Sequence, residues 1–430
     1  MKQKLTLEEK LAKRKLTRPP HLLYWLLGYI WKFVFTRRLH VSYKYNIRLK
    51  DFKGPYFVIS NHASRVDYLY TGAAFLPHRL NYVAGYNEFF RSHLALIFHL
   101  FQVVPKRNFT TDINTIKQIS RIIKKKGKII VFPEGMSSIS GSNQPCAIGT
   151  GKLIKHFGIP VLMTHISGGY LTNTKYCLDE RAGKVNVEIS SLFTSEDIKN
   201  MSEEEIQSKI DCVIHHDDYE WNKTARVRFD GHGEMAKNLH TLLYWCPRCH
   251  HELTMEGNGN AITCKHCGNG AYLNEYYDLI PNDGESVIPE TPVKWFDLER
   301  ENAYKVVSQP DFVLEEKVRL GTLLPYDTLK NLKTSELVGE GVLRLDPTGM
   351  TYTGTKYGKP FTFHMNPETL PTFGMCTDTS FITTYHNYEY YEFYPERPVA
   401  IKWLHYAEEL HRIKGGKWKN FPNVPFYQEK

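Results

Sequence analysis

Short apolar runs alternate with helical stretches in the first half of the chain. Tyr56–Ser60, Lys128–Phe132 and Ile159–Ile166 are runs of the length and character of buried strands. Between the first two, apolar side chains recur at helical spacing, at Ile113, Ile116, Ile119, Ile122 and Ile123. Residues 149–157 also favour a helix. This order of strand, helix and strand predicts an α/β domain with a mostly parallel sheet.

The last third of the chain has a different pattern. Short strands separated by Gly, Pro, Asn and Asp turns are expected at 341–345, 350–353, 361–364, 380–384 and 388–394. A helix begins near Pro398 and places apolar side chains on one face, at Val399, Trp403, Tyr406, Ala407, Leu410 and Ile413. A strand meander closed by one amphipathic helix resembles a pleckstrin-homology-like barrel.

The N-terminal segment combines an apolar run with positive charge. The formal charge of the chain is +9. Residues 1–50 hold thirteen Lys and Arg against two Glu, so the other 380 residues carry a net charge of −2. The run Leu22–Phe35 is interrupted by Lys32 and is shorter than the roughly 20 residues of a spanning helix. We expect it to dock on a membrane surface, although an ordinary core helix behind a basic tail has the same pattern.

Four of the eight cysteines fall in two C-x-x-C pairs, Cys246 with Cys249 and Cys264 with Cys267. No export signal is recognisable, so we expect a reducing compartment, in which metal binding is favoured over disulfides. Two such pairs, fourteen residues apart, supply four thiolates around a Zn²⁺ ion as in zinc ribbons. A closed four-thiolate site stabilises its module and does no chemistry. A disulfide or redox pair is the alternative.

Polar residues that could perform chemistry follow two of the predicted strands. Asn61-His62-Ala63-Ser64-Arg65-Val66-Asp67 follows the first, and Phe132-Pro133-Glu134-Gly135 follows the second. Between them, Val103-Val104-Pro105-Lys106-Arg107 leads from an apolar strand to two cations. Parallel sheets place their chemistry where strands end. His can take up a proton near neutral pH, and Asp67 is spaced to orient its ring.

These residues resemble the glycerolipid acyltransferase family, which includes the lysophosphatidate acyltransferases. Its Asn-His-x4-Asp motif is matched by Asn61, His62 and Asp67. Its Phe-Pro-Glu-Gly-x-x-Ser motif is matched by Phe132, Pro133, Glu134, Gly135 and Ser138. An apolar stretch leading to Arg is matched loosely by 101–107, and an apolar strand opening with Pro by 159–162. The resemblance covers about residues 40–215.

The resemblance implies transfer of a fatty acyl group to the hydroxyl of a lysophospholipid, with 1-acylglycerol-3-phosphate, giving phosphatidate, as the first expectation. The acyl donor is acyl-CoA or acyl-carrier protein, and no covalent acyl-enzyme is required. His62 is the expected general base, oriented by Asp67. The expected substrate-binding residues are Asn61, Ser64, Lys106, Arg107, Glu134, Gly135 and Ser138.

One departure from the family pattern concerns the acceptor. The family commonly has Thr-Arg after Glu-Gly, whereas this chain has Met136-Ser137. A cation that would contact a phosphate is therefore missing at that position. The sequence leaves open whether the acceptor is lysophosphatidate, another lysophospholipid or a less charged lipid.

The predicted organisation has four parts: a basic, membrane-docking segment at 1–40, an acyltransferase domain at 41–235, a zinc ribbon at 240–282 and a β-rich domain at 300–415. We expect the protein on the cytoplasmic face of a membrane, with phospholipid, the lysolipid acceptor and an acyl-carrier protein as candidate partners. The alternative is a membrane-bound adaptor with an inactive acyltransferase fold that recruits partners through the ribbon. Nucleic acid is not expected, because the flanks of the cysteine pairs are not notably basic.

Overall fold

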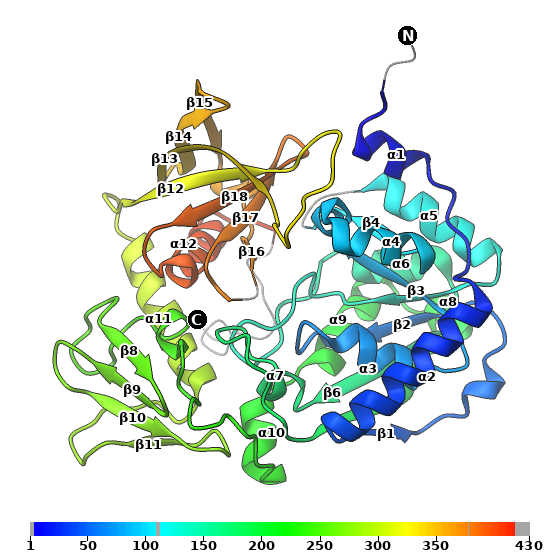
Figure 1. Cartoon of the computed structure of the whole chain (residues 1–430), viewed down its shortest axis with the longest axis horizontal. Helices are drawn as coiled ribbons and strands as arrows, with labels where there is room; N and C mark the ends of the chain where they lie inside the picture. Colours follow the sequence, from blue (N-terminus) through cyan, green and yellow to red (C-terminus); the bar gives the residue numbers. More distant parts are fainter. Residues whose placement is uncertain (1–3, 109–111, 377, 418–430) are drawn as a thin grey trace.

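The computed structural model describes residues 4–108, 112–376 and 378–417. Its strands form three sheets, with seven, four and seven members. Figure 1 shows the helix-covered first sheet on one side of the molecule and the two other sheets together on the opposite side. The chain therefore combines one α/β part with two largely antiparallel parts.

The first sheet has the strand order β1-β7-β6-β2-β5-β3-β4. All pairings are parallel except β6 with β7, which is antiparallel. This confirms the prediction of a mostly parallel sheet. Its strands are β1 (Val41–Tyr45), β2 (Phe57–Ser60), β3 (Leu80–Gly85), β4 (Val104–Lys106), β5 (Lys128–Val131), β6 (Val161–Ser167) and β7 (Val185–Phe193).

Alternate residues of the central strands belong to two different cores. Phe57 and Ile59 of β2 pack in one cluster, whereas Val58 between them packs in the other. Because successive side chains of a strand point to opposite faces, both faces of β2 are covered and its four residues are all buried. The continuous apolar run in the sequence reflects this burial on both sides.

Helices cover both faces of this sheet. One face receives α5 (Ile113–Lys124), α6 (Thr150–Phe157), α8 (Ser195–Asn200) and α9 (Glu203–Ile214), and the other receives α2 (His21–Arg38) and α3 (Asp67–Ala74). Ser202 and Glu205 form a reciprocal capping box at the start of α9. The helices expected from the isoleucine spacing and at 149–157 are confirmed as α5 and α6. The remaining helices of this part are α1 (Leu7–Lys13), α4 (Ser92–Leu100), α7 (Gly169–Thr172) and α10 (Asp218–Ala225).

The small second sheet contains the cysteine pairs. Its strands are β8 (Met255–Asn258), β9 (Ala261–Cys264), β10 (Gly270–Leu273) and β11 (Leu279–Pro281), in the order β11-β10-β9-β8. A tight antiparallel hairpin joins β8 to β9, with Asn258 opposite Ala261. This hairpin lies between the two cysteine pairs.

The third sheet is antiparallel, in the order β15-β14-β13-β12-β18-β17-β16. It contains the five strands expected from the sequence and two that the pattern missed, β12 and β16. Its strands are β12 (Leu314–Thr322), β13 (Glu336–Asp346), β14 (Gly349–Lys356), β15 (Lys359–Met365), β16 (Gly374–Met375), β17 (Ile382–His386) and β18 (Glu389–Pro395).

The prediction of a barrel is wrong for the residues that the structure describes, because no pairing joins β15 to β16 at the two ends of this sheet. β16 has only two residues, and the carbonyl of Met375 accepts a hydrogen bond from Lys175 in the α/β part. This end of the sheet therefore faces another part of the chain and not its own far edge.

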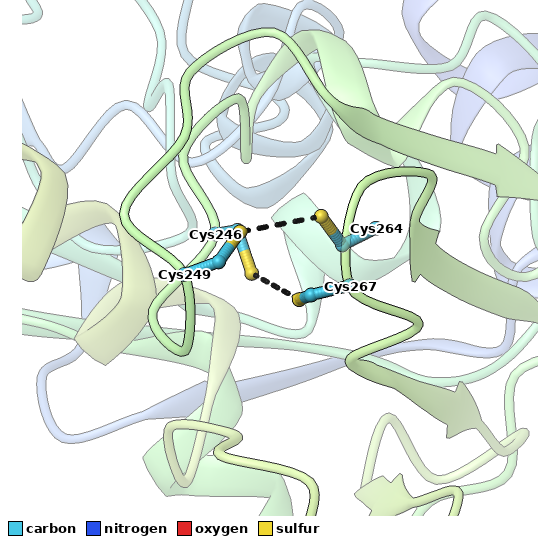
Figure 2. A group of neighbouring side chains, drawn as sticks. All are labelled: Cys246, Cys249, Cys264 and Cys267. Atoms are coloured by element: carbon cyan, nitrogen blue, oxygen red, sulfur yellow. Dashed lines mark hydrogen bonds between the residues drawn. The ribbon is translucent and has the colours of Figure 1, made fainter.

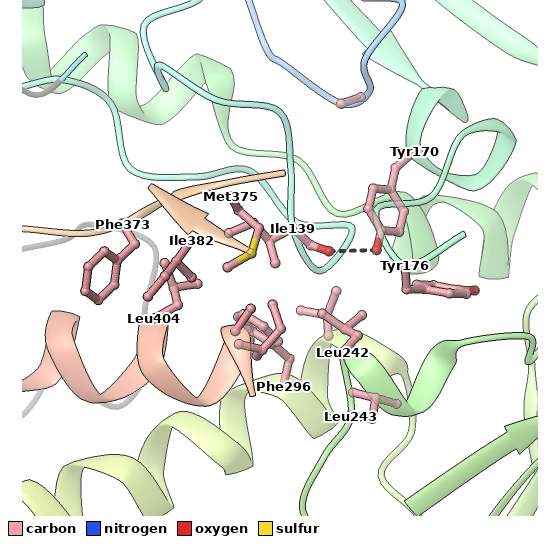
Figure 3. Packing of buried hydrophobic residues seen from close by; sticks show 14 of the residues in the cluster. Ile139, Tyr170, Tyr176, Leu242, Leu243, Phe296, Phe373, Met375, Ile382 and Leu404 are labelled. Atoms are coloured by element: carbon pink, nitrogen blue, oxygen red, sulfur yellow. Dashed lines mark hydrogen bonds between the residues drawn. The ribbon is translucent and has the colours of Figure 1, made fainter. Parts of the chain in front are cut away.

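Helices α11 (Pro292–Val307) and α12 (Ala400–Ile413) pack against each other and join the parts. One cluster of buried residues runs from the α/β part through both helices to the third sheet (Figure 3). Ile139 and Tyr170 meet Leu242, Phe296, Met375 and Leu404 in this cluster. The face expected on α12 is buried at Trp403, Tyr406, Ala407 and Leu410, whereas Ile413 is exposed.

Helix α2 leaves a row of large apolar side chains in contact with solvent. Leu22, Leu26, Tyr29, Ile30 and Phe33 are each at least 48% exposed and recur at helical spacing. Tyr24 and Phe35 are buried against the sheet domain. Within the described part of the chain, none of the helices has the length and apolarity needed to cross a bilayer.

Candidate functional site

The loop after β2 is fixed at its first residue. The side chain of Asn61 is 2% exposed and forms two hydrogen bonds with the backbone of Ile166, at the end of β6. Its amide nitrogen donates to the Ile166 carbonyl, and its oxygen accepts from the Ile166 amide, both at 2.8 Å. Asn61 thus ties the ends of two neighbouring strands together. These contacts support a positioning role, while the prediction that it binds substrate stays a prediction.

His62 and Asp67 form the pair that their spacing predicts. His62 Nδ1 lies 3.0 Å from Asp67 Oδ2. Asp67 is fully buried in the first turn of α3, and it also accepts hydrogen bonds from the amide of Ser64 at 2.8 Å and from its hydroxyl at 2.7 Å. Hydrogen bonds from Ser64 therefore fix the Asp67 carboxylate in the position from which it orients the imidazole ring. In this arrangement Ser64 donates its hydrogen bonds to Asp67.

The imidazole of His62 is partly accessible, since its side chain is 20% exposed. One face of the ring packs on Phe132, with ring centroids 4.4 Å apart. Because Nδ1 is used by Asp67, Nε2 is the nitrogen left to exchange a proton with a substrate. A small cavity borders His62 and is also lined by Glu134, Ser138, Asn143 and His216.

Glu134 lies three residues after the end of β5, and its side chain holds the His62 loop. Its carboxylate accepts hydrogen bonds from the amides of His62 and Gln144, each at 2.6 Å, and the side chain is 1% exposed. Burial raises the pKa of Glu134 to about 8, and the two backbone donors oppose that rise. Both oxygens are occupied by backbone groups, so these contacts fit an ordering role for Glu134.

The residues after Glu134 close the loop onto His62. Gly135 has a φ of +76°, a left-handed conformation that a side chain would strain. The amide of Ser138 donates to the His62 carbonyl at 2.7 Å. The Ser138 hydroxyl donates to the Ser142 carbonyl at 2.6 Å and accepts from the amide of Gly141 at 2.9 Å. Ser138 thus links the loop after β5 to the loop that contains His62 through its backbone amide.

Lys106 is the last residue of β4, and Arg107 follows it. Asn108 donates to the Gly135 carbonyl at 2.8 Å, which joins the two segments. The Arg107 guanidinium is ion-paired with Glu8 of α1 and stacks on the ring of Tyr86 at 4.2 Å, with Tyr388 of the third sheet at 5.7 Å. Burial lowers the pKa of Lys106. Both cations already have protein partners, and their role in phosphate binding stays a prediction.

Sequence reasoning missed one cation in this region. Lys175 follows α7 in the chain, and its Nζ lies 3.3 Å from the hydroxyl of Ser137. It therefore lies beside the position at which the sequence lacks the arginine of the resembling family. A single lysine in an irregular loop carries no periodicity or spacing signal, so only the fold could reveal it.

The four cysteines of the second sheet converge (Figure 2). Their sulfur atoms all lie within 4.8 Å of one another, with Cys246 and Cys267 at 3.6 Å and Cys249 and Cys264 at 3.7 Å. A zinc–sulfur bond of about 2.3 Å gives a tetrahedron whose sulfur–sulfur edge is about 3.8 Å, so the spacing fits Zn²⁺. These separations far exceed a disulfide bond of about 2.05 Å.

Neighbouring polar groups orient two of these sulfurs. Asn269 donates to Cys246 Sγ at 3.6 Å, and the hydroxyl of Thr254 lies 3.2 Å from Cys264 Sγ. Such contacts hold thiolate ligands in place around a metal. Four thiolates leave no open coordination position, so this centre is suited to stabilising the fold.

Comparison with known proteins concerns the part of the chain that carries His62. Residues 38–167 match the family model described as Acyltransferase. Among solved structures, the 1-acyl-sn-glycerophosphate (LPA) acyltransferase PlsC from Thermotoga maritima is similar at 18% identity and a TM-score of 0.39, over 47% of this chain and 80% of that one. No curated protein matches the chain. The family match contains His62, Asp67 and Glu134, and this chain therefore carries a domain of the acyltransferase family at residues 38–167.

Proposed function

We propose that this protein transfers a fatty acyl group from acyl-CoA or acyl-carrier protein to the free hydroxyl of a lysophospholipid. The most specific form of the proposal is conversion of 1-acylglycerol-3-phosphate to phosphatidate. The observation that carries it is the hydrogen bond between a partly accessible His62 and a fully buried Asp67, within the residues that match the acyltransferase family.

The proposed step is a direct transfer. His62 Nε2 accepts the proton of the acceptor hydroxyl while its oxygen attacks the thioester carbonyl carbon. The carbon–sulfur bond then breaks, and the departing thiolate takes the proton from the imidazolium. Asp67 keeps the ring in the tautomer that leaves Nε2 free to accept, and it stabilises the imidazolium between the two proton transfers. No group on the enzyme is acylated.

A membrane supplies the acceptor in this proposal. The exposed apolar row on α2 offers side chains that a bilayer surface would bury, including Leu22, Leu26 and Phe33. Arg37 and Arg38 at the end of the same helix would attract anionic headgroups. We propose that the protein lies on the cytoplasmic face of a membrane, as a peripheral or monotopic enzyme.

The zinc ion belongs to the proposal as a structural component. Cys246, Cys249, Cys264 and Cys267 would hold it, and it would supply no chemistry to acyl transfer.

The test is acyl transfer by the full chain, purified with zinc present and mixed with lipid vesicles. Labelled acyl-CoA or acyl-carrier protein is offered with a panel of lysolipids. His62→Ala is expected to lower the rate by about 10²–10⁴-fold. His156→Ala, which alters an exposed histidine on α6, is the matched control and should retain activity. Absence of transfer from either donor to every acceptor, in folded protein, would reject the enzyme and favour the adaptor.

A further inference from the structure

Lys175 is a buried cation without a carboxylate partner among the described residues. Its side chain donates to the Ser137 hydroxyl and to the Met375 carbonyl, both at 3.3 Å. Both acceptors are neutral and both contacts are long, yet Lys175 is only 6% exposed. A buried ammonium group that is not paired costs folding free energy.

The titration of Lys175 reflects this environment. The pKa of Lys175 falls to about 8, chiefly because burial disfavours the charged form; Cys376 and Asp378 oppose this fall, and the Arg65 guanidinium adds to it. An apolar residue would avoid this cost. A costly group placed beside a candidate active site is commonly there for function.

Arg65 supplies a second positive charge in the same region. It lies between His62 and Asp67 in the chain, and its Nη2 donates to the Leu178 carbonyl at 2.6 Å. Its other terminal nitrogen, Nη1, is buried and has no hydrogen-bond partner among the described residues. The Arg65 guanidinium thus has one terminal nitrogen available to donate to a ligand.

The acids near Arg65 are engaged elsewhere. Glu180 is ion-paired with Arg38 at 2.6 Å, and Asp179 with Lys237 at 2.8 Å. Asp378, which acts on Lys175, accepts hydrogen bonds from Ser380. The region around Ser137 therefore has two cations whose neighbouring carboxylates are held by other groups.

Neighbouring residues connect these groups to the His62 loop. Arg65 is part of that loop, and Ser138, the neighbour of Ser137, donates its amide to the His62 carbonyl. A Cβ on Gly169, at the start of α7, would lie 3.1 Å from the Cβ of Ala63, so the segment leading to Lys175 packs on the same loop. Ser137 itself is only partly buried.

We propose that Lys175, with Arg65 and the Ser137 hydroxyl, binds the phosphate group of a lysophosphatidate-type acceptor beside His62. The proposal rests on the acyl-transfer function given above and names the residues that bind the phosphate of its acceptor. Lysine binds phosphate as a point charge, and arginine adds a directional donor. Lys175 thereby supplies, from a different segment, the positive charge that position 137 lacks. The phosphates of CoA offer the same chemistry, so the experiment separates the two sources.

The first measurement is binding, which does not depend on catalysis. Calorimetry compares glycerol 3-phosphate, glycerol and CoA as ligands of the full chain. We expect glycerol 3-phosphate to bind and glycerol not to, with Lys175→Met weakening binding by about 10–100-fold. Lys175→Arg should retain most of the affinity. Lys184→Met, at an exposed lysine of the same part, is the matched control.

The second measurement is steady-state acylation. Lys175→Met is expected to raise KM for lysophosphatidate by about 10–100-fold, with a smaller change in kcat and none in KM for acyl-CoA. Acylation of a monoacylglycerol, which has no phosphate, should not change. Adding Ser137→Arg to Lys175→Met should restore part of the affinity, because the new guanidinium would occupy the same space.

The outcomes separate the two proposals. Acyl transfer with unchanged phosphate affinity in folded Lys175→Met protein overturns the phosphate site and leaves the enzyme intact. A change in KM for acyl-CoA alone also overturns it, because the cation then serves the donor. Lys175-dependent binding of glycerol 3-phosphate, without acyl transfer by the wild type, supports the phosphate site and rejects the acyltransferase.

Discussion

The burial of Lys175 predicts that removing its charge will stabilise the protein. Its pKa falls from the ordinary 10.5 to about 8. A difference of that size, at about 1.4 kcal/mol per unit, corresponds to a cost of about 3 kcal/mol below pH 8. Lys175→Met removes the charge and loses two long hydrogen bonds worth about 1 kcal/mol each at most. We therefore expect the variant to be more stable than the wild type by about 1–3 kcal/mol at pH 7.

The stability difference between the wild type and Lys175→Met should change with pH in one direction. Because the folded pKa of this base lies below its unfolded value, the folded state binds fewer protons between pH 8 and 10.5. The wild type should gain stability relative to Lys175→Met as pH rises through this window, and the advantage of the variant should shrink accordingly. Urea unfolding followed by tryptophan fluorescence at pH 7 and pH 10 measures both effects. A variant that is less stable at pH 7, or a stability difference that does not change with pH, would refute the reasoning.

Three further predictions concern other parts of the molecule. Asp67→Asn should lower kcat by about 10³–10⁴-fold in folded protein, because an amide neither fixes the imidazole tautomer nor stabilises the imidazolium; an acylation assay with circular dichroism as folding control checks this, and near-normal kcat contradicts it. The full chain should carry one zinc ion by elemental analysis, and Cys264→Ser should lose that ion and lower the melting temperature; an unchanged metal content would exclude the site. Leu26→Glu with Phe33→Glu should weaken binding to anionic vesicles while leaving acylation of a short-chain soluble acceptor intact, and equal vesicle binding would exclude α2 as the contact.

The local pattern of the sequence predicts the elements that build the α/β part. Strands β2, β5 and β6 are apolar on both faces, and α5 has isoleucines at helical spacing, so each element is encoded within its own residues. The spacing of His62 and Asp67 likewise predicts their contact, because a single turn brings the two side chains together. The C-x-x-C spacing within each cysteine pair likewise predicts the cluster of four sulfurs.

Features that depend on distant segments were not predictable. Helix α11 was missed, since its apolar residues pack on α12 more than a hundred residues later and its exposed face mixes charges. The partners of Arg107 come from α1 and from the hairpin that carries Tyr388. Lys175 meets Ser137 and Met375 only because α7 and β16 come together. No pattern within a short window contains such information.

The position of β7 sets a limit on how this chain can be divided. The residues that match the family end at 167, yet β7 lies beyond that point and separates β1 from β6 in the sheet. A fragment ending at residue 167 would leave β1 without its neighbour and expose the edge of β6, a ready template for pairing with other chains. The residues that match the family are therefore only part of the segment that forms the complete sheet. Gene fusions or domain exchanges that use only the matching residues should yield aggregates, and those that continue past Phe193 keep the sheet complete.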